Sequence, residues 1–177
     1  MTEEKNAGAG LRQWAEAAKA FRLPQWEALP ELELYMDQVN VLLNRYLGDA
    51  ALREGEEGQV TPSMINNYVK MGLIPRPHKK KYTRVHLAAL IMICSLKNTH
   101  AIATIRTLLP DPMDEPAMEA TYRAYVREHA AAVERFTEGL AQEDAPEAAI
   151  VIRAAVEAEL GRSLTAYIGR ACGRIEE

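Results

Sequence analysis

Apolar residues recur at helical spacing over residues 31–47 and mark the first strongly amphipathic segment of the chain. They fall every three or four positions, which is the period of one face of an α-helix. Acidic residues at the start of the segment suit the positive end of a helix, and Gly48 follows its end. We therefore predict a helix over 31–47, in which the residues that recur at helical spacing are Leu32, Tyr35, Val39, Leu42, Leu43 and Tyr46. A shorter amphipathic helix is predicted over 11–21, before two prolines interrupt the chain.

A second helix is predicted over 62–71, because the sequence carries signals for both of its ends. Thr61 is a typical N-cap residue, and Pro62 suits the first helical position, where no backbone N–H is needed. Gly72 can adopt the left-handed conformation that often ends a helix. The two sides of this helix differ in character, with Ile65, Tyr68 and Val69 on the apolar side and Ser63, Asn66, Asn67 and Lys70 on the polar one.

A basic loop and an almost wholly apolar helix follow. Two prolines exclude a helix over 75–81 and three consecutive lysines exclude burial, so we predict a stiff, protruding loop there. Thr83 then caps a helix over 84–98, in which apolar residues occupy nearly every face, as in a helix buried on all sides. A further helix is predicted over 101–109.

The last third of the chain also has a helical pattern. Apolar and aromatic residues over 118–136 are spaced by 4, 3, 4, 3 and 4 positions, which is a heptad stripe, and a final helix begins near Pro146 with a break expected at Gly161. The predicted fold class is all-α. We expect a helical extension over 1–25, a helix-turn-helix domain over 26–110 and a C-terminal helical region over 111–177 that dimerises or regulates.

The charge of the chain is unevenly distributed. The formal net charge is −4, but residues 59–110 include eight Lys or Arg and no Asp or Glu. That stretch therefore carries +8, and the rest of the chain carries −12. A purely basic segment in an acidic protein indicates a polyanionic partner, and an ordinary solvated surface is the alternative interpretation.

Two packed helices followed by a basic loop form a winged helix-turn-helix, whose second helix enters the major groove of DNA. Asn can pair with adenine, Lys can reach guanine or phosphate, and a basic loop fixes position through phosphates. The helices over 31–47 and 62–71 and the loop over 75–81 follow this order. For two of the candidates, both tyrosines, a place in the core is an equally open interpretation. The residues expected to contact duplex DNA are Ser63, Asn66, Asn67, Tyr68, Lys70, Arg76, Lys79, Lys80, Lys81, Tyr82 and Arg84.

Two segments resemble MerR-type regulators. Residues 65–75, Ile-Asn-Asn-Tyr-Val-Lys-Met-Gly-Leu-Ile-Pro, are similar to the second helix of that family, whose pattern is Leu-Arg-x-Tyr-Glu-x-x-Gly-Leu-Ile followed by proline. Residues 80–87, Lys-Lys-Tyr-Thr-Arg-Val-His-Leu, are similar to its wing. The resemblance implies a MerR-like winged helix-turn-helix, with or without a small β wing, in a DNA-binding regulator of transcription. This sequence departs from the family pattern at Asn66 and Lys80, where the family has arginine, and at Val69, where it has glutamate.

A narrower resemblance covers roughly residues 26–109. The segments 34–39 (Leu-Tyr-Met-Asp-Gln-Val), 64–70 (Met-Ile-Asn-Asn-Tyr-Val-Lys) and 80–82 (Lys-Lys-Tyr) look like a bacterial family labelled only as domain of unknown function 1836. This resemblance implies a MerR-like fold and carries no established activity.

The sequence lacks the patterns that are typical of catalytic and cofactor sites. It has no Walker loop, no dinucleotide-binding glycine fingerprint and no zinc-protease helix. The four histidines have no Cys or carboxylate at the spacing of metal ligands. We therefore expect no enzyme activity, no cofactor and no metal. No apolar run is long enough to span a membrane and the N-terminus has no signal-peptide pattern, so a cytoplasmic location is expected.

A homodimer is expected, because helix-turn-helix domains present one recognition helix each and bind paired half-sites. The stripe over 118–136 and the apolar face over 150–168 are the candidate surfaces. Two alternative functions remain open. One is a protein-interaction module that docks an acidic partner on the same fold, and the other is a regulator whose C-terminal helices form a ligand pocket.

Overall fold

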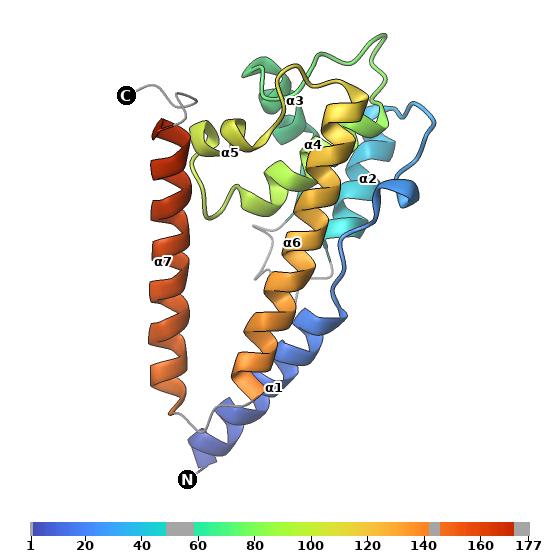
Figure 1. Cartoon of the computed structure of the whole chain (residues 1–177). Coiled ribbons are helices and arrows are strands. Elements are labelled where there is room, and N and C mark those ends of the chain that lie inside the picture. Colours follow the sequence, from blue (N-terminus) through green and yellow to red (C-terminus); the bar gives the residue numbers. More distant parts are fainter. Residues whose placement is uncertain (1, 49–58, 142–145, 172–177) are drawn as a thin grey trace. The chain divides into compact units, whose positions relative to one another are not determined.

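The structure is a computed structural model that describes residues 2–48, 59–141 and 146–171 (Figure 1). These residues form seven α-helices, a short 3-10 helix and two isolated β-bridges, with no strand among them. The all-α fold class is therefore confirmed. The helices are α1 (Thr2–Ala20), η1 (Trp26–Ala28), α2 (Met36–Leu47), α3 (Pro62–Lys70), α4 (Arg84–Leu96), α5 (Ile102–Leu108), α6 (Glu115–Ala141) and α7 (Glu147–Ala171).

The chain divides into two compact units. The first unit combines Met1–Arg22 with Glu128–Glu177 and so contains α1, the later part of α6 and α7. The second unit, Leu23–Arg127, contains η1, α2 to α5 and the beginning of α6. The helices and the basic loop that the sequence associates with DNA all belong to the second unit.

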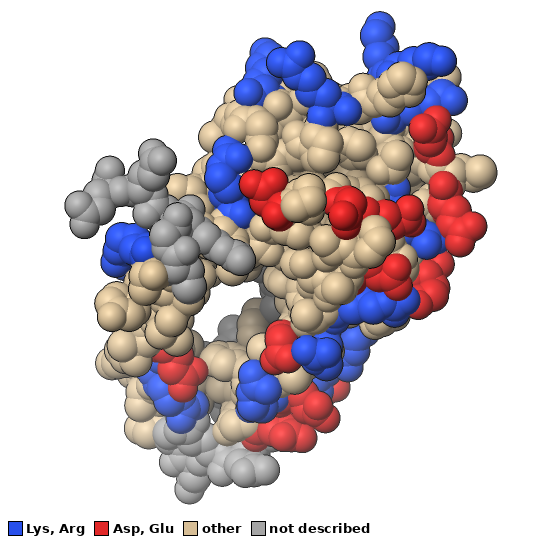
Figure 2. Space-filling model, turned by 45° about the horizontal axis from the view of Figure 1, so that its top comes forward, with Lys and Arg blue, Asp and Glu red and all other residues tan. Residues whose placement is uncertain are grey.

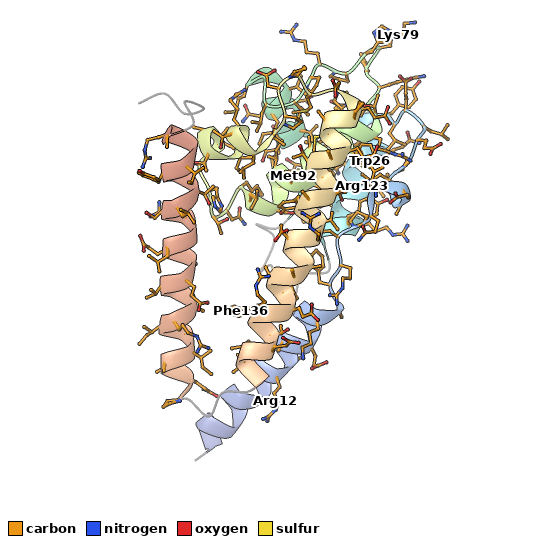
Figure 3. All side chains as sticks on the ribbon, in the orientation of Figure 1. Arg12, Trp26, Lys79, Met92, Arg123 and Phe136 are labelled. Carbon is orange, nitrogen blue, oxygen red and sulfur yellow. The ribbon has the colours of Figure 1, made fainter. Side chains whose placement is uncertain are left out.

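Helix α4 forms the centre of the second unit. Ten consecutive residues of this helix, Val85 to Cys94, are buried, among them Met92 (Figure 3). Helix α2 packs against α4 and contributes Val39, Leu43 and Leu47 to the core. The prediction of a helix buried on all sides is confirmed, because ten consecutive buried residues cover every face of α4.

The beginning of α6 completes this core. Tyr122 is fully buried, its hydroxyl donates a hydrogen bond to the carbonyl oxygen of Pro24 at 2.9 Å, and burial raises its pKa. The Tyr122 ring centroid lies 6.2 Å from that of Trp26, and the Arg84 guanidinium lies 5.3 Å from the same Trp26 ring. Helix α6 therefore encloses the core through an aromatic side chain whose polar end has a hydrogen-bond partner.

The later part of α6 uses the same stripe to pack within the first unit. Phe136 lies edge-on to Trp14 of α1, with ring centroids 5.8 Å apart (Figure 3). His129 makes a similar contact with Phe21, also at 5.8 Å. The aromatic side chains of the stripe over 118–136 thus have partners in their own chain, and this stripe is not a free surface.

Three helices differ most from the sequence predictions. Helix α2 begins at Met36 and not at 31, because Leu34 exchanges two backbone hydrogen bonds of 2.8 Å with Tyr82 and keeps the preceding residues extended. Helix α1 begins well before position 11. Helix α7 continues through Gly161 without the expected break. The period of apolar residues alone did not reveal the distant pairing of Leu34.

The start of α4 is held by an unusual capping box. The backbone N–H of Thr83 donates to Nδ1 of His86 at 3.1 Å, where Glu or Gln is the usual acceptor. His86 is buried and its ring lies edge-on to Tyr82, with centroids 5.5 Å apart. Burial lowers the pKa of His86, and the backbone of Pro75 opposes part of this shift. Since Nδ1 accepts a hydrogen bond, protonation of the ring would break this cap.

Acidification is expected to destabilise the fold through His86. Its pKa is below the usual 6.5, so the unfolded chain binds more protons in the window between the two pKa values. The contribution of His86 is fully present above about pH 6.5 and is lost as the pH falls through the folded-state pKa. His86→Gln keeps a capping-box acceptor that does not titrate, so it should lose less stability between pH 7.5 and 5.5, by about 1 kcal/mol, the usual value of a cap.

Urea denaturation at the two pH values measures this difference. His129→Gln is the control, because the pKa of His129 is also lowered, mainly by burial and to a smaller extent by the charge of Arg22. Each variant should remove only its own share of the pH dependence. An unchanged loss of stability on acidification in His86→Gln would show that another group is responsible.

Candidate nucleic-acid interface

Helix α3 turns a polar face to solvent. Thr61 Oγ1 accepts a hydrogen bond from the backbone N–H of Met64 at 3.3 Å, and Pro62 lies in the first turn, as predicted. Ile65 and Tyr68 are buried and fix the rotation of the helix. Four predicted contact residues are exposed as a consequence, namely Ser63, Asn66, Asn67 and Lys70.

The end of α3 has the geometry of a Schellman motif. The backbone N–H of Leu73 donates to Tyr68 O at 2.9 Å, and that of Gly72 donates to Val69 O at 3.1 Å. Gly72 has a φ of 64°, a left-handed conformation that other residues rarely adopt. The prediction that Gly72 ends this helix is confirmed.

Two side chains from other helices hold the two ends of α3. Asn44 of α2 donates through Nδ2 to Val60 O and accepts through Oδ1 from Val60 N, both at 2.9 Å. Arg106 of α5 donates to the carbonyl oxygens of Gly72 and Met71 at 2.9 and 2.7 Å. Sequence reasoning missed both contacts, because each joins residues that are distant along the chain and no local pattern announces them.

The segment 75–81, here called the wing, ends in a tight turn. The backbone N–H of Lys81 donates to His78 O at 2.9 Å, and these residues form an isolated antiparallel bridge. Lys79 and Lys80 between them have φ values of 49° and 63°. Positive φ at both central residues is typical of the type I′ turn, where Asn-Gly is preferred. Both lysines are exposed, and Lys79 points away from the body of the unit (Figure 3).

Two of the predicted cations are engaged with other residues. Lys81 Nζ lies 3.3 Å from Glu33 Oε2 and 6.0 Å from the centroid of the Tyr35 ring. Arg84 donates to Leu29 O at 3.1 and 2.8 Å and pairs with Glu31 at 3.2 Å. Residues 59–110 contain no Asp or Glu, but the fold places Glu31 and Glu33 next to two of their cations.

The other predicted cations are exposed and form no ion pair with a described residue. Among the residues that the structure describes, Lys70, Arg76, Lys79 and Lys80 form no ion pair. Lys and Arg side chains gather along the upper edge of Figure 2. Charged groups without internal partners can neutralise an external anion without first breaking an ion pair.

The two predicted tyrosines belong to the core. Tyr68 is 5% exposed and Tyr82 is 3% exposed. Burial raises the pKa of Tyr68 to about 12 and also raises the pKa of Tyr82. Of the two interpretations that the sequence left open for these side chains, the structure therefore favours packing over contact with a ligand at the surface.

A groove of about 510 Å³ lies beside the C-terminal end of α3. Its walls come from the end of α3, residues 72–76 and the end of α5 with the segment that follows. Lys70, Arg76 and Arg106 line it, together with a single carboxylate, that of Asp111. A concave and mainly basic surface next to an exposed polar helix suits a phosphate backbone.

Other kinds of site have less support in the described parts of the chain. These residues contain no group of three His, Cys, Asp or Glu side chains that could hold a metal ion, and none of their helices has the length and apolarity to cross a membrane. A hollow of about 410 Å³ occurs between α6 and α7, lined in part by Arg135, Phe136 and Glu157. It lies where a ligand pocket was expected as an alternative.

Comparison with known proteins gives one match. The model of a family described as "Domain of unknown function (DUF1836)" matches residues 24–126, which is more than half of the chain. The match covers η1, α2 to α5 and the beginning of α6, and it leaves out α1 and α7. No curated protein and no solved structure matches the chain.

Replacing Arg106 with Ala should loosen the C-terminal end of α3, since two carbonyl oxygens lose a charged donor. Water can reach these exposed groups, so the expected loss in the free energy of unfolding is about 1 kcal/mol. The backbone amides of residues 71–73 should exchange faster with solvent. Urea denaturation and hydrogen exchange measure the two effects.

Arg76→Ala is the matched control, because it removes the same charge from the same groove and leaves the Arg106 hydrogen bonds intact. It should change neither stability nor exchange. If the two variants behave alike, Arg106 does not position α3.

Proposed function

The chain belongs to the family described as "Domain of unknown function (DUF1836)", and we propose that its matched region is a MerR-like winged helix-turn-helix that binds duplex DNA and regulates transcription. The observation that carries the proposal is that one unit exposes both the polar face of α3 and the lysines at the tip of the wing. Helix α3 offers Ser63, Asn66, Asn67 and Lys70, and the wing tip offers two uncommitted lysines. Both features lie at the upper edge of Figure 1.

The wing and the groove supply the contacts to phosphates. Lys79 and Lys80 extend from a tight two-residue turn, and Lys70 and Arg76 line the groove beside α3. Each phosphate that such a cation neutralises releases condensed counterions, which gives affinity without sequence preference. These contacts set the position and register of α3 on the duplex.

Helix α3 supplies the contacts to bases. Asn66 and Lys70 lie one turn apart on the same face, and Asn67 lies on the adjoining strip with Ser63. In the major groove, the side-chain amide of an Asn can donate to N7 of adenine and accept from its N6 amino group. Such a pair requires that the helix be held in a fixed rotation. The buried Ile65 and Tyr68 provide that rotation.

Lys81 and Arg84 have a different role in this proposal. Lys81 joins the wing to Glu33, and Arg84 joins the start of α4 to Leu29 and Glu31. Both side chains therefore hold the base of the wing against residues 29–35. They position the DNA-binding lysines and do not themselves contribute most of the charge that meets the phosphates.

The first expected result is binding to mixed-sequence duplex DNA at low salt. With about four phosphate contacts, a plot of log affinity against log salt concentration should have a slope near −3.6, since each contact contributes about −0.9. Fluorescence anisotropy of a labelled duplex measures it. An absence of binding at low salt would contradict the DNA proposal, and binding to an acidic protein would then become the better explanation of the basic surface.

A sharper test separates the charge of the wing from its stability. The double variant Lys79→Asn, Lys80→Gly places the preferred Asn-Gly pair in a type I′ turn, so it should be more stable than the wild type by about 1 kcal/mol. It should nevertheless bind all duplexes more weakly, with a salt slope flattened by up to about 1.8.

Arg12→Ala with Lys19→Ala is the control for that variant, because it removes two exposed positive charges from α1. It should leave the salt slope unchanged. If the Asn-Gly variant binds DNA as the wild type does, the wing is not a DNA-binding element.

Base recognition is tested with Asn66→Ala and Asn67→Ala. One of the two substitutions should abolish the preference at a single base pair, at a cost of about 1–3 kcal/mol for the preferred sequence, with little change in nonspecific affinity. Selection of bound duplexes from a random pool, repeated for each variant, measures the preference. If both variants keep the full preference, α3 does not read bases.

A further inference from the structure

Helix α7 leaves most of its apolar side chains in solvent. Of its 25 residues, only Ile150 and Gly169 are buried. Seven large apolar side chains of this helix are between 50% and 67% exposed, namely Val151, Ile152, Val156, Leu160, Leu164, Tyr167 and Ile168. Single exposed apolar residues are common at protein surfaces, but a contiguous row of them marks an interaction site.

Five of these residues form one row, here called the α7 stripe. Ile152, Val156, Leu160, Leu164 and Ile168 follow one another at intervals of four. An α-helix turns 100° per residue, so each step of four moves the row by only about 40° around the axis. Over its length of about 24 Å the α7 stripe therefore winds about 160° around the helix. Its three central members, Val156, Leu160 and Leu164, span about 80° of one side, and Tyr167 lies beside them.

The charges of α7 indicate what covers the stripe. The half before Leu160, from Glu147 to Glu159, contains three carboxylates and one arginine and so carries −2. The half after it, from Gly161 to Ala171, contains two arginines and carries +2. An antiparallel copy of α7 would place each half against the half of opposite charge, and a parallel copy would place like charges together.

The stripe has the same symmetry as the charges. Leu160 is its central member, so an antiparallel copy can place Leu160 on a two-fold axis opposite its own equivalent. Val156 then faces Leu164 of the other copy. A two-fold interface needs a surface that is complementary to itself, and both the apolar row and the charges of α7 meet that requirement.

We propose that a second copy of this chain covers the α7 stripe, with the two α7 helices antiparallel and Leu160 at the two-fold axis. The stripe over 118–136 does not serve this purpose, because its aromatic side chains have partners within the chain. Helix α7 also lies outside residues 24–126, so self-association and the proposed DNA binding reside in different parts of the sequence. Self-association can be measured without DNA, so its outcome is independent of the proposed function.

The oligomeric state of the full chain is the first measurement. Light scattering at about 50 µM should give the mass of a dimer for the wild type. Leu160→Glu places two like charges on the two-fold axis and should weaken association at least 100-fold, with an unchanged circular dichroism spectrum. Ala155→Glu adds the same charge at another exposed position of α7 and should leave the dimer intact. Val156→Asn provides a second, milder change in case the Leu160 variant does not fold.

Two results of this measurement would overturn the proposal. A wild-type chain that is monomeric at this concentration would mean that the stripe is covered within one chain or not at all. A dimer that Leu160→Glu and Val156→Asn both leave unaffected would mean that the chain associates through another surface.

Cysteine cross-linking tests the antiparallel register in a Cys172→Ser background. Leu160→Cys should form a disulfide-linked dimer on mild oxidation, because each residue 160 faces its own equivalent. Val156→Cys alone and Leu164→Cys alone should not, but an equimolar mixture of the two should. In a parallel pair every position faces its own equivalent, so efficient cross-linking of each single variant would contradict the proposed arrangement.

Discussion

The complete burial of helix α4 is the constraint on which the rest of the second unit depends. A helix with ten consecutive buried residues can exist only if other elements enclose it on every side. Helix α2 packs against it, and the fully buried Tyr122 and its contact with Trp26 belong to the same core. The wing leads directly into α4 through the Thr83–His86 capping box, so the core fixes the position of the wing together with the contacts of Lys81 and Arg84.

The fold separates two kinds of basic residue. Those near the base of the wing, Lys81 and Arg84, have acids and carbonyl oxygens beside them and contribute to the local structure. Those at its tip, Lys79 and Lys80, have left-handed backbone conformations, which are unfavourable for residues with a Cβ atom. A glycine at either position would be less strained. Two charged residues kept at strained positions, without internal partners, are more readily explained by an external anion than by stability.

The sequence was informative wherever the determinants are local. Thr61, Pro62 and Gly72 located both ends of α3, and the density of apolar residues identified α4 as buried. It was uninformative about contacts between distant residues. The pairing of Leu34 with Tyr82, which delays the start of α2, and the hold of Arg106 on the end of α3 follow from the assembled fold. The candidate site was therefore predictable in its exposed residues, but not in the residues that position them or in the acids that engage two of its cations.

Helices α4 and α7 show what apolarity can and cannot reveal. Both carry large apolar side chains on more than one face, and this pattern predicts burial without saying which surface provides it. For α4 the chain itself provides it, as its fully buried residues show. For α7 the chain buries only Ile150 and Gly169 among the residues of the helix. Exposed apolar surface on this scale is unfavourable in water, and the opposite charges of the two halves of α7 match an antiparallel copy of the same helix. The residues matched by the family end before α7, so the proposed DNA binding and the proposed pairing of two chains reside in different parts of the sequence.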